Sequence, residues 1–275
     1  MIQEGINLMD RGDLTAAQQR FEEAVRQDPA DYRARYYLGE VFFRRRQFDE
    51  AKAQFREALR IKPDAQSVRF ELGLIAEEEE RYDEAYDLHR EVIAKAPGTP
   101  AAKASADRLR LFGGTREAFR ASHEHFAAAN RLIAQGKFDA GEAELRVVIQ
   151  LAPGNINALS LLGRILLQSK KNEEAIQIFE QLVRLNPNAV GTLYQLALLY
   201  EERQEFDRAI AAYKEIIARG KGTPQADAAK KKLAIIGEDP ASAKRGFELF
   251  ESGEKALKDG KLDDARRYYQ EVLAL

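Results

Sequence analysis

A short internal repeat limits the possible folds of this chain more strongly than any other property of its sequence. Pro29, Pro63 and Pro97 are equally spaced, and Pro153 and Pro187 are separated by the same interval. Each proline follows a stretch in which apolar residues recur at intervals of three and four, as they do on one face of a helix. A unit of about 34 residues accommodates two helices and a turn, and proline cannot continue a helix. The spacing therefore predicts a stack of helical hairpins.

The clearest copy of the repeat ends at Pro63. Gly39 and Ala51 are the small residues at which its two helices would cross, because larger side chains there would push the helix axes apart. The same two positions are small in seven copies. In the first helix they are Gly5, Gly39, Gly73, Ala129, Gly163, Ala197 and Gly253, and in the second they are Ala17, Ala51, Ala85, Gly141, Ala175, Ala209 and Ala265. We therefore expect seven hairpins.

This unit resembles the tetratricopeptide repeat. The residues that carry the resemblance are Leu38, Gly39, Phe42, Ala51, Phe55, Ala58 and Pro63. The resemblance implies an all-α fold, a right-handed α-solenoid of helical hairpins whose first helices line a concave face. Some copies depart from the family pattern, at Arg35, Arg69, His125, Asn172 and Lys221. We expect these copies to be weaker repeats of the same architecture.

A longer period lies over the short repeat. The segment 99–113 returns as 223–237, and each copy begins with Thr-Pro and ends with glycine. Threonine is a good N-cap, proline suits the first turn and glycine suits the end, so each copy predicts one helix added after a third repeat. The longer period, which is the interval from Thr99 to Thr223, divides the chain into a first group at 1–113, a second at 114–237 and the start of a third at 238–275. Both ends fall within a repeat, so we expect a longer array.

Composition narrows the possible functions. A net charge of −2 and a pI near 6.1 argue against a general nucleic-acid binder, which needs a basic face. The absence of cysteine excludes disulfides and thiolate metal sites. The sequence shows neither a signal peptide nor a long apolar run, so we expect no direct membrane insertion. A soluble protein is expected, with the cytoplasm slightly preferred, and no cofactor is expected.

Three histidines are the main candidates for acid–base or metal chemistry. His123 and His125 are two residues apart on a predicted helix, so they point to different faces and cannot chelate one ion together. His89 stands where other copies have phenylalanine or tyrosine, which predicts a packed core histidine. We therefore predict a non-catalytic protein.

The candidate binding residues lie on the first helix of each hairpin, on the face that the family resemblance places in the concave groove. Four residues after the start of the repeat, five of seven copies have an aromatic residue: Tyr36, Phe70, Phe126, Tyr194 and Phe250. One turn later the same face carries Glu40, Leu74, Asn130, Arg164 and Leu198. Rings in a groove would anchor a peptide or a helix. The alternative is that each ring packs between repeats, in place of a large residue missing one position earlier.

Acidic residues at the ends of first helices are a second candidate feature. Glu77 and Glu78 recur as Glu201 and Glu202, one longer period later. Negative charge is unfavourable at the C-terminal end of a helix. Two roles are therefore open for these glutamates: they select basic residues in a partner, or they are simply solvated. The basic run 44–46 also ends a first helix. It either complements the helix dipole or binds phosphate or an acidic peptide.

The predicted function is a non-catalytic scaffold or adaptor. Its partner is expected to be a protein segment, a peptide or a helix with basic residues, bound in the concave groove. Two alternatives stay open. In one, the chain is the substrate-recruiting arm of a larger enzyme such as a glycosyltransferase. In the other, the array is structural and self-associates through apolar surface at its incomplete ends.

Overall fold

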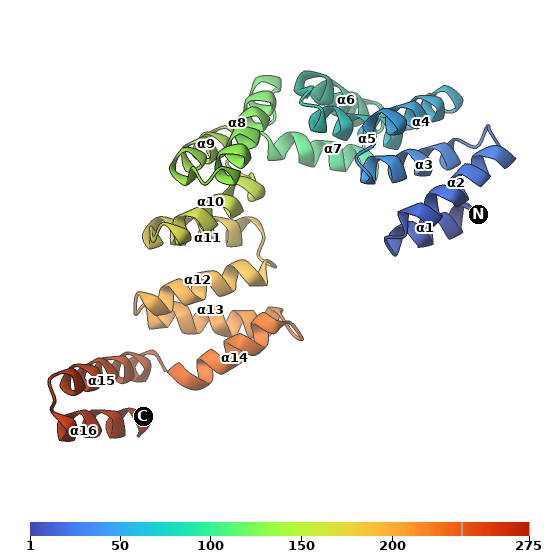
Figure 1. Cartoon of the computed structure of the whole chain (residues 1–275). Helices are drawn as coiled ribbons and strands as arrows, with labels where there is room; N and C mark the ends of the chain where they lie inside the picture. Colours follow the sequence, from blue (N-terminus) through green and yellow to red (C-terminus); the bar gives the residue numbers. More distant parts are fainter. Residues whose placement is uncertain (238, 275) are drawn as a thin grey trace. The chain divides into compact units, whose positions relative to one another are not determined.

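The computed structural model describes residues 1–237 and 239–274, and in these residues the regular elements are all α-helices (Figure 1). The chain divides into two compact units, an N-terminal unit of residues 1–155 and a C-terminal unit of residues 156–275. The N-terminal unit contains α1 (Ile2–Asp10), α2 (Leu14–Gln27), α3 (Tyr32–Arg44), α4 (Phe48–Ile61), α5 (Gln66–Glu78), α6 (Tyr82–Lys95), α7 (Pro100–Leu111), α8 (Arg116–Ala134) and α9 (Phe138–Leu151). The C-terminal unit contains α10 (Ile156–Gln168), α11 (Asn172–Leu185), α12 (Val190–Glu202), α13 (Phe206–Arg219), α14 (Pro224–Ile236), α15 (Pro240–Lys258) and α16 (Leu262–Leu273).

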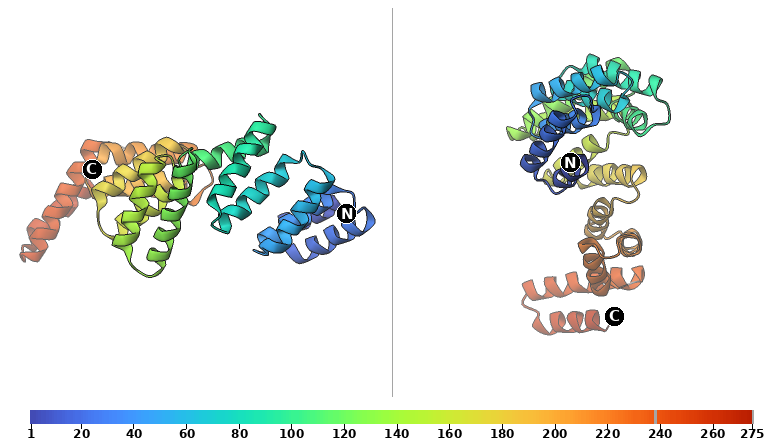
Figure 2. Two further views of the ribbon diagram at one scale, coloured as in Figure 1. Left: turned by 90° about the horizontal axis from the view of Figure 1, so that it is seen from above. Right: turned by 90° about the vertical axis from the view of Figure 1, so that its right-hand side faces the viewer.

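Within each unit, consecutive helices pair as antiparallel hairpins. In the N-terminal unit the pairs are α1 with α2, α3 with α4, α5 with α6 and α8 with α9, and α7 packs on α5 and α6. In the C-terminal unit the pairs are α10 with α11, α12 with α13 and α15 with α16, and α14 packs on α12 and α13. Figure 2 shows this pairing in two further views. The described residues therefore confirm the all-α class and the seven predicted hairpins.

The two added helices begin where the sequence predicts. The Thr99 side chain accepts a hydrogen bond from the backbone N–H of Ala102 over 3.3 Å, and Thr223 caps α14 in the same way. The helices that follow, α8 and α15, have 19 residues each, whereas α3 and α5 have 13. Each insertion therefore supplies an added helix and also lengthens the first helix of the next hairpin.

The small residue of the first helix leaves space for a ring on the second helix of the same hairpin. A Cβ added to Gly39 would lie 2.7 Å from the Phe55 ring, and one added to Gly73 would lie 2.8 Å from the His89 ring. Real Cβ atoms do not approach a neighbour this closely, so a larger residue would force the ring to move. The size limit predicted from the sequence is confirmed, and the neighbour that sets it is this ring of the second helix.

Each hairpin turns through one residue in the left-handed region of backbone conformation. Three of these residues are glycines: Gly12, Gly136 and Gly260. The other four have φ between 57° and 61° and are Arg46, Glu80, Lys170 and Gln204. A side chain makes this conformation unfavourable by about 1–2 kcal/mol. Four hairpins therefore have a strained turn that glycine would relieve.

Candidate functional site

The five predicted aromatic residues, here called the aromatic ladder, occupy equivalent positions in their hairpins. Four of them contact a ring on the second helix of the same hairpin. The centroid distances are 6.0 Å for Tyr36–Phe55, 5.6 Å for Phe70–His89, 6.1 Å for Tyr194–Tyr213 and 5.7 Å for Phe250–Tyr269. The fifth, Phe126, has leucine at the corresponding position and lies 6.4 Å from the ring of Phe112, at the end of α7. Each ladder ring therefore rests on a ring of its own unit.

No ladder ring is fully buried. Four are half-buried, and Phe250 is 49% exposed. Tyr36 also reaches the next hairpin, where its hydroxyl donates to Glu71 Oε1 over 3.4 Å. Burial, followed by the nearby charge of Glu40, raises the pKa of Glu71 to about 7. The ladder thus combines partly open rings with a weakly acidic carboxyl group beside one of them.

One turn further along the first helices, the predicted residues differ in exposure. Asn130 and Arg164 are exposed, whereas Leu74 and Leu198 are half-buried. Glu40 is half-buried as well, and its Oε1 lies 2.8 Å from Arg44 Nη2 on the same helix. Glu40 is therefore paired with a cation of its own helix.

Glu77 is inaccessible to a partner, and the prediction that it selects basic residues is wrong. It is only 7% exposed. Its Oε1 lies 2.9 Å from His89 Nε2, and Arg108 of α7 donates to both carboxylate oxygens. Burial alone would raise the pKa of Glu77, but the hydrogen bonds from His89 and Arg108 outweigh burial and hold the pKa below its usual value. Glu77 therefore holds the added helix α7 against the hairpin α5–α6.

The three histidines lie in different surroundings. His89 is fully buried, as predicted, and its Nδ1 lies 3.2 Å from Ser105 Oγ of α7. His123 is stacked 3.7 Å from Phe112, and burial lowers its pKa to about 4. His125 points elsewhere, with Nδ1 2.5 Å from a glutamate oxygen of α9. Among the described residues, no group of three or more histidine or acidic side chains is arranged to hold a metal ion.

The C-terminal unit repeats the polar arrangement around Glu77 one longer period later. Glu201 Oε1 accepts a hydrogen bond from Lys232 of α14 over 2.8 Å, and Glu201 Oε2 accepts one from the Tyr213 hydroxyl over 2.7 Å. Lys232 has the position of Arg108 in the longer period. Sequence reasoning missed this role, although a cation at the same distance after each glutamate was a readable signal. The charge of Glu201 is therefore used inside the unit, where it holds the added helix.

Glu78 and Glu202, which directly follow Glu77 and Glu201 in the sequence, are both exposed. Glu78 Oε2 lies 3.0 Å from Arg46 Nη2 of the preceding hairpin. All three arginines of the basic run 44–46 form ion pairs or hydrogen bonds with side chains of the N-terminal unit. At the position of Arg46 the C-terminal unit has Lys170, and in the described part of the chain Glu202 forms no ion pair. Glu202 is therefore the predicted acidic residue that a partner can reach most readily.

One pocket of the C-terminal unit brings together four of the predicted residues. These are Leu198, Glu201, Glu202 and Phe250. The pocket has a volume of about 710 Å³ and lies between α12, α14 and α15, and Ile236 and Phe247 contribute to its apolar walls. Pockets of this size with mostly apolar walls and a few polar groups are typical of binding sites. The inserted helix α14 thus helps to build a site that the hairpins alone would lack.

Comparison with protein-family models decides the family. A model of the tetratricopeptide repeat matches residues 2–65 and 41–100, and a second model of the same repeat matches residues 132–189 and 166–233. The chain belongs to the tetratricopeptide repeat family. Among curated proteins, no sequence matches it.

The chain is similar to several solved structures, two of which are described as tetratricopeptide repeat proteins. The repeat domain of P58(IPK) is 19% identical, with a TM-score of 0.45 over 99% of this chain and 71% of that chain. Yeast Tom70 is 20% identical, with a TM-score of 0.45 over 89% of this chain and 49% of that chain. YrrB, described as having an unusual peptide-binding site, is 15% identical, with a TM-score of 0.38 over 77% of this chain and 97% of that chain.

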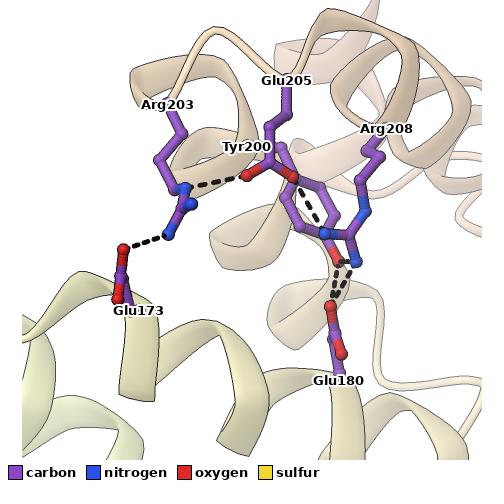
Figure 3. A network of polar contacts seen from close by, with 6 residues as sticks. All are labelled: Glu173, Glu180, Tyr200, Arg203, Glu205 and Arg208. Carbon is purple, nitrogen blue, oxygen red and sulfur yellow. Dashed lines mark hydrogen bonds and ion pairs between the residues drawn. The ribbon is translucent and has the colours of Figure 1, made fainter.

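A second polar network holds two tetratricopeptide repeats of the C-terminal unit together (Figure 3). In it, Glu173 and Glu180 reach from α11 toward Arg203 and Arg208. Arg203 Nη1 lies 3.1 Å from Glu173 Oε1, and Arg208 donates to Glu180. The Tyr200 hydroxyl donates to Glu180 over 2.8 Å, and the Arg208 guanidinium lies 3.9 Å from the centre of the Tyr200 ring. These contacts join neighbouring repeats, so we assign the network a structural role.

None of the described helices of this tetratricopeptide repeat chain combines the length and the apolar character needed to cross a bilayer.

Proposed function

We propose that this protein is a scaffold that binds a segment of a partner protein, a peptide or a helix, on the faces of its two units that carry the aromatic ladder. The tetratricopeptide repeat fold supports a role in protein–protein interaction in general, and the family is generally non-catalytic. The observation that carries the finer proposal is the repeated ring pair. A partly exposed ring that is supported by a second ring loses little conformational freedom on binding, which favours it as an anchor.

The residues of the proposed groove follow from the exposure and pairing described above. The ladder supplies the apolar anchors, and the leucines one turn later extend them: Tyr36, Phe70, Leu74, Phe126, Tyr194, Leu198 and Phe250. Asn130, Arg164 and Glu202 are exposed and supply polar contacts. Glu40, Glu77 and Glu201 are left out of the groove because their charges are paired inside the protein.

The test is a capture experiment with the whole chain and two variants. Phe70→Ala combined with Tyr194→Ala removes two ladder rings. Tyr32→Ala is the matched control, because Tyr32 is a half-buried ring outside the ladder, covered by Lys62 at 4.7 Å. We expect a protein from a lysate of the source cells to bind the parent and the control, and to bind the double variant with affinity weaker by about a hundredfold. Equal retention by the parent and the double variant would refute the proposed groove.

Self-association is a second candidate that one observation favours. Leu262 and Leu273 of α16 are 66% and 87% exposed, so this helix presents apolar side chains to water. Sedimentation of the chain over a range of concentrations tests this candidate. A mass that rises with concentration in the parent but not in a Leu262→Glu, Leu273→Glu variant would support it, and a constant monomer mass would exclude it.

A further inference from the structure

The pocket between α12, α14 and α15 presents apolar surface to water. Its lining includes Ile235, which is 80% exposed, and Phe250, which is 49% exposed. Apolar side chains that are held open beside a cavity of about 710 Å³ lose contact with water when a partner fills the cavity. Binding of an apolar group in the pocket is therefore favourable.

In the N-terminal unit, a buried side chain occupies the position that corresponds to this pocket. At the position equivalent to Ala243 stands Phe119, which is fully buried. Its ring centroid lies 5.9 Å from that of Phe112 and 4.6 Å from that of His123. These two neighbours correspond to Ile236 and Phe247, which line the pocket of the C-terminal unit. The pocket is therefore lined by alanine where the N-terminal unit has a buried phenylalanine. Two more of its lining residues stand at the positions of the rings that pack against Phe119.

The charges at the edge of the pocket favour a cation. Glu201 and Lys232 both line it, and they neutralise each other across 2.8 Å. Glu202 also lines it and is exposed, with no ion pair in the part of the chain that the structure describes. In the N-terminal unit the equivalent Glu78 is paired with Arg46. The pocket edge thus has one uncompensated negative charge beside an apolar cavity.

We propose that this pocket binds a phenylalanine side chain of a partner peptide and that a lysine or arginine of the same peptide pairs with Glu202. The proposal rests on the proposed function, because Leu198 and Phe250 belong to the groove and also line the pocket. It adds the chemistry of the partner: an aromatic anchor with a basic residue within about one helical turn of it.

The test uses the whole chain and a library of random dodecapeptides displayed on phage. Peptides selected on the parent are synthesised, and their affinity is measured by fluorescence anisotropy. Ala243→Phe places in the pocket the side chain that the N-terminal unit has there, and Ala243→Ser is its control because serine leaves the pocket open. We expect the selected peptides to share a phenylalanine next to a basic residue. Their affinity should fall about thirtyfold or more with Ala243→Phe, about three- to tenfold with Glu202→Gln, and less than about twofold with Ala243→Ser.

Ile235→Lys is a second variant that tests the pocket even if Ala243→Phe fails to fold. Ile235 is exposed, so the substitution leaves the fold intact, and it places a positive charge in the lining of the pocket, which should weaken the same peptides about tenfold. Peptides that bind the parent, Ala243→Phe and Ile235→Lys equally would overturn the pocket. A dimer of the parent that Ala243→Phe abolishes would assign the pocket to a second copy and overturn the peptide.

The pocket and the groove fail in different ways. A partner that is lost by the Phe70→Ala, Tyr194→Ala variant but retained by Ala243→Phe would leave the scaffold in place and overturn the pocket. A partner that neither substitution affects would overturn both proposals.

Discussion

His123 is a buried imidazole whose replacement by phenylalanine should make the N-terminal unit more stable in acid. It lies between Phe112 and Tyr82, and its side chain is 11% exposed. Its Nε2 lies 3.5 Å from Glu77 Oε2 but forms no hydrogen bond. Burial lowers its pKa from 6.5 to about 4, although the nearby charge of Glu77 acts in the opposite direction. The C-terminal unit has Phe247 at the equivalent position, so the chain itself contains the replacement in the same setting.

The sign of the pH dependence follows from the lowered pKa. Between pH 6.5 and about 4 the unfolded chain binds a proton at this position and the folded chain does not. The contribution of His123 to the free energy of unfolding is therefore fully present above pH 6.5 and decreases as the pH falls. The difference between 6.5 and about 4 corresponds to a loss of about 3 kcal/mol.

His123→Phe should remove this loss. It also eliminates a buried nitrogen without a partner, which adds about 1 kcal/mol of stability at neutral pH. We expect guanidinium unfolding to show parent and variant differing by about 1 kcal/mol at pH 7 and by about 4 kcal/mol at pH 4. Hydrogen exchange of the α8 amides localises the effect. In NMR spectra, the His123 resonance is the one that is absent from the variant. Its chemical shift should be that of a neutral imidazole at pH 5.5. Titration of that resonance near pH 6.5, or equal acid sensitivity of the two proteins, would refute the reasoning.

Three further substitutions test other parts of the structure. Glu71 has a pKa of about 7 instead of 4.5, so its neutral form is stabilised by folding, and stability should fall by up to about 3 kcal/mol as the pH rises from 4.5 through 7. Glu71→Gln, which keeps an acceptor for the Tyr36 hydroxyl, should flatten this part of the pH profile measured by thermal unfolding; an unchanged profile would contradict the raised pKa. Gly39→Leu should destabilise the chain by about 1–3 kcal/mol, because its Cβ would lie 2.7 Å from the Phe55 ring; chemical denaturation with no loss would show that the ring moves freely. Lys170→Gly should raise the free energy of unfolding by about 1 kcal/mol by relieving a turn at φ 57°, and a decrease would show that this turn is unstrained.

The architecture was predictable because its signals are local. The distances between small residues, large apolar residues and prolines depend only on helical geometry, so they indicated seven hairpins before any tertiary contact was known. The start of α7 was equally readable, because a threonine cap and a first-turn proline act within one turn of the helix. The ladder rings occupy equivalent places in their hairpins because they occupy equivalent places in the repeat, and their role in binding a partner stays a prediction.

The site was only partly predictable, as two glutamates illustrate. Glu77 and Glu202 both stand at the C-terminal end of a first helix, and the sequence alone assigned them the same role. The structure separates them: Glu77 is enclosed by His89 and Arg108, whereas Glu202 is exposed at the edge of a pocket. Burial of a charged group depends on partners that are distant in sequence, and the sign of it in the sequence was the cation that follows Glu77 at the distance at which Lys232 follows Glu201.

Periodicity along the chain was thus enough to predict the hairpins, the order of the helices and the two added helices, because each of these follows from spacing on a helix. Tertiary structure alone decided which charges are paired inside the protein and where a cavity remains. Both outcomes depend on the volumes and charges of side chains brought together from separate helices. One difference between the units is that Phe119 of the N-terminal unit corresponds to Ala243 of the C-terminal unit. Phe119 belongs to the buried core of its unit, whereas Ala243 lines the pocket.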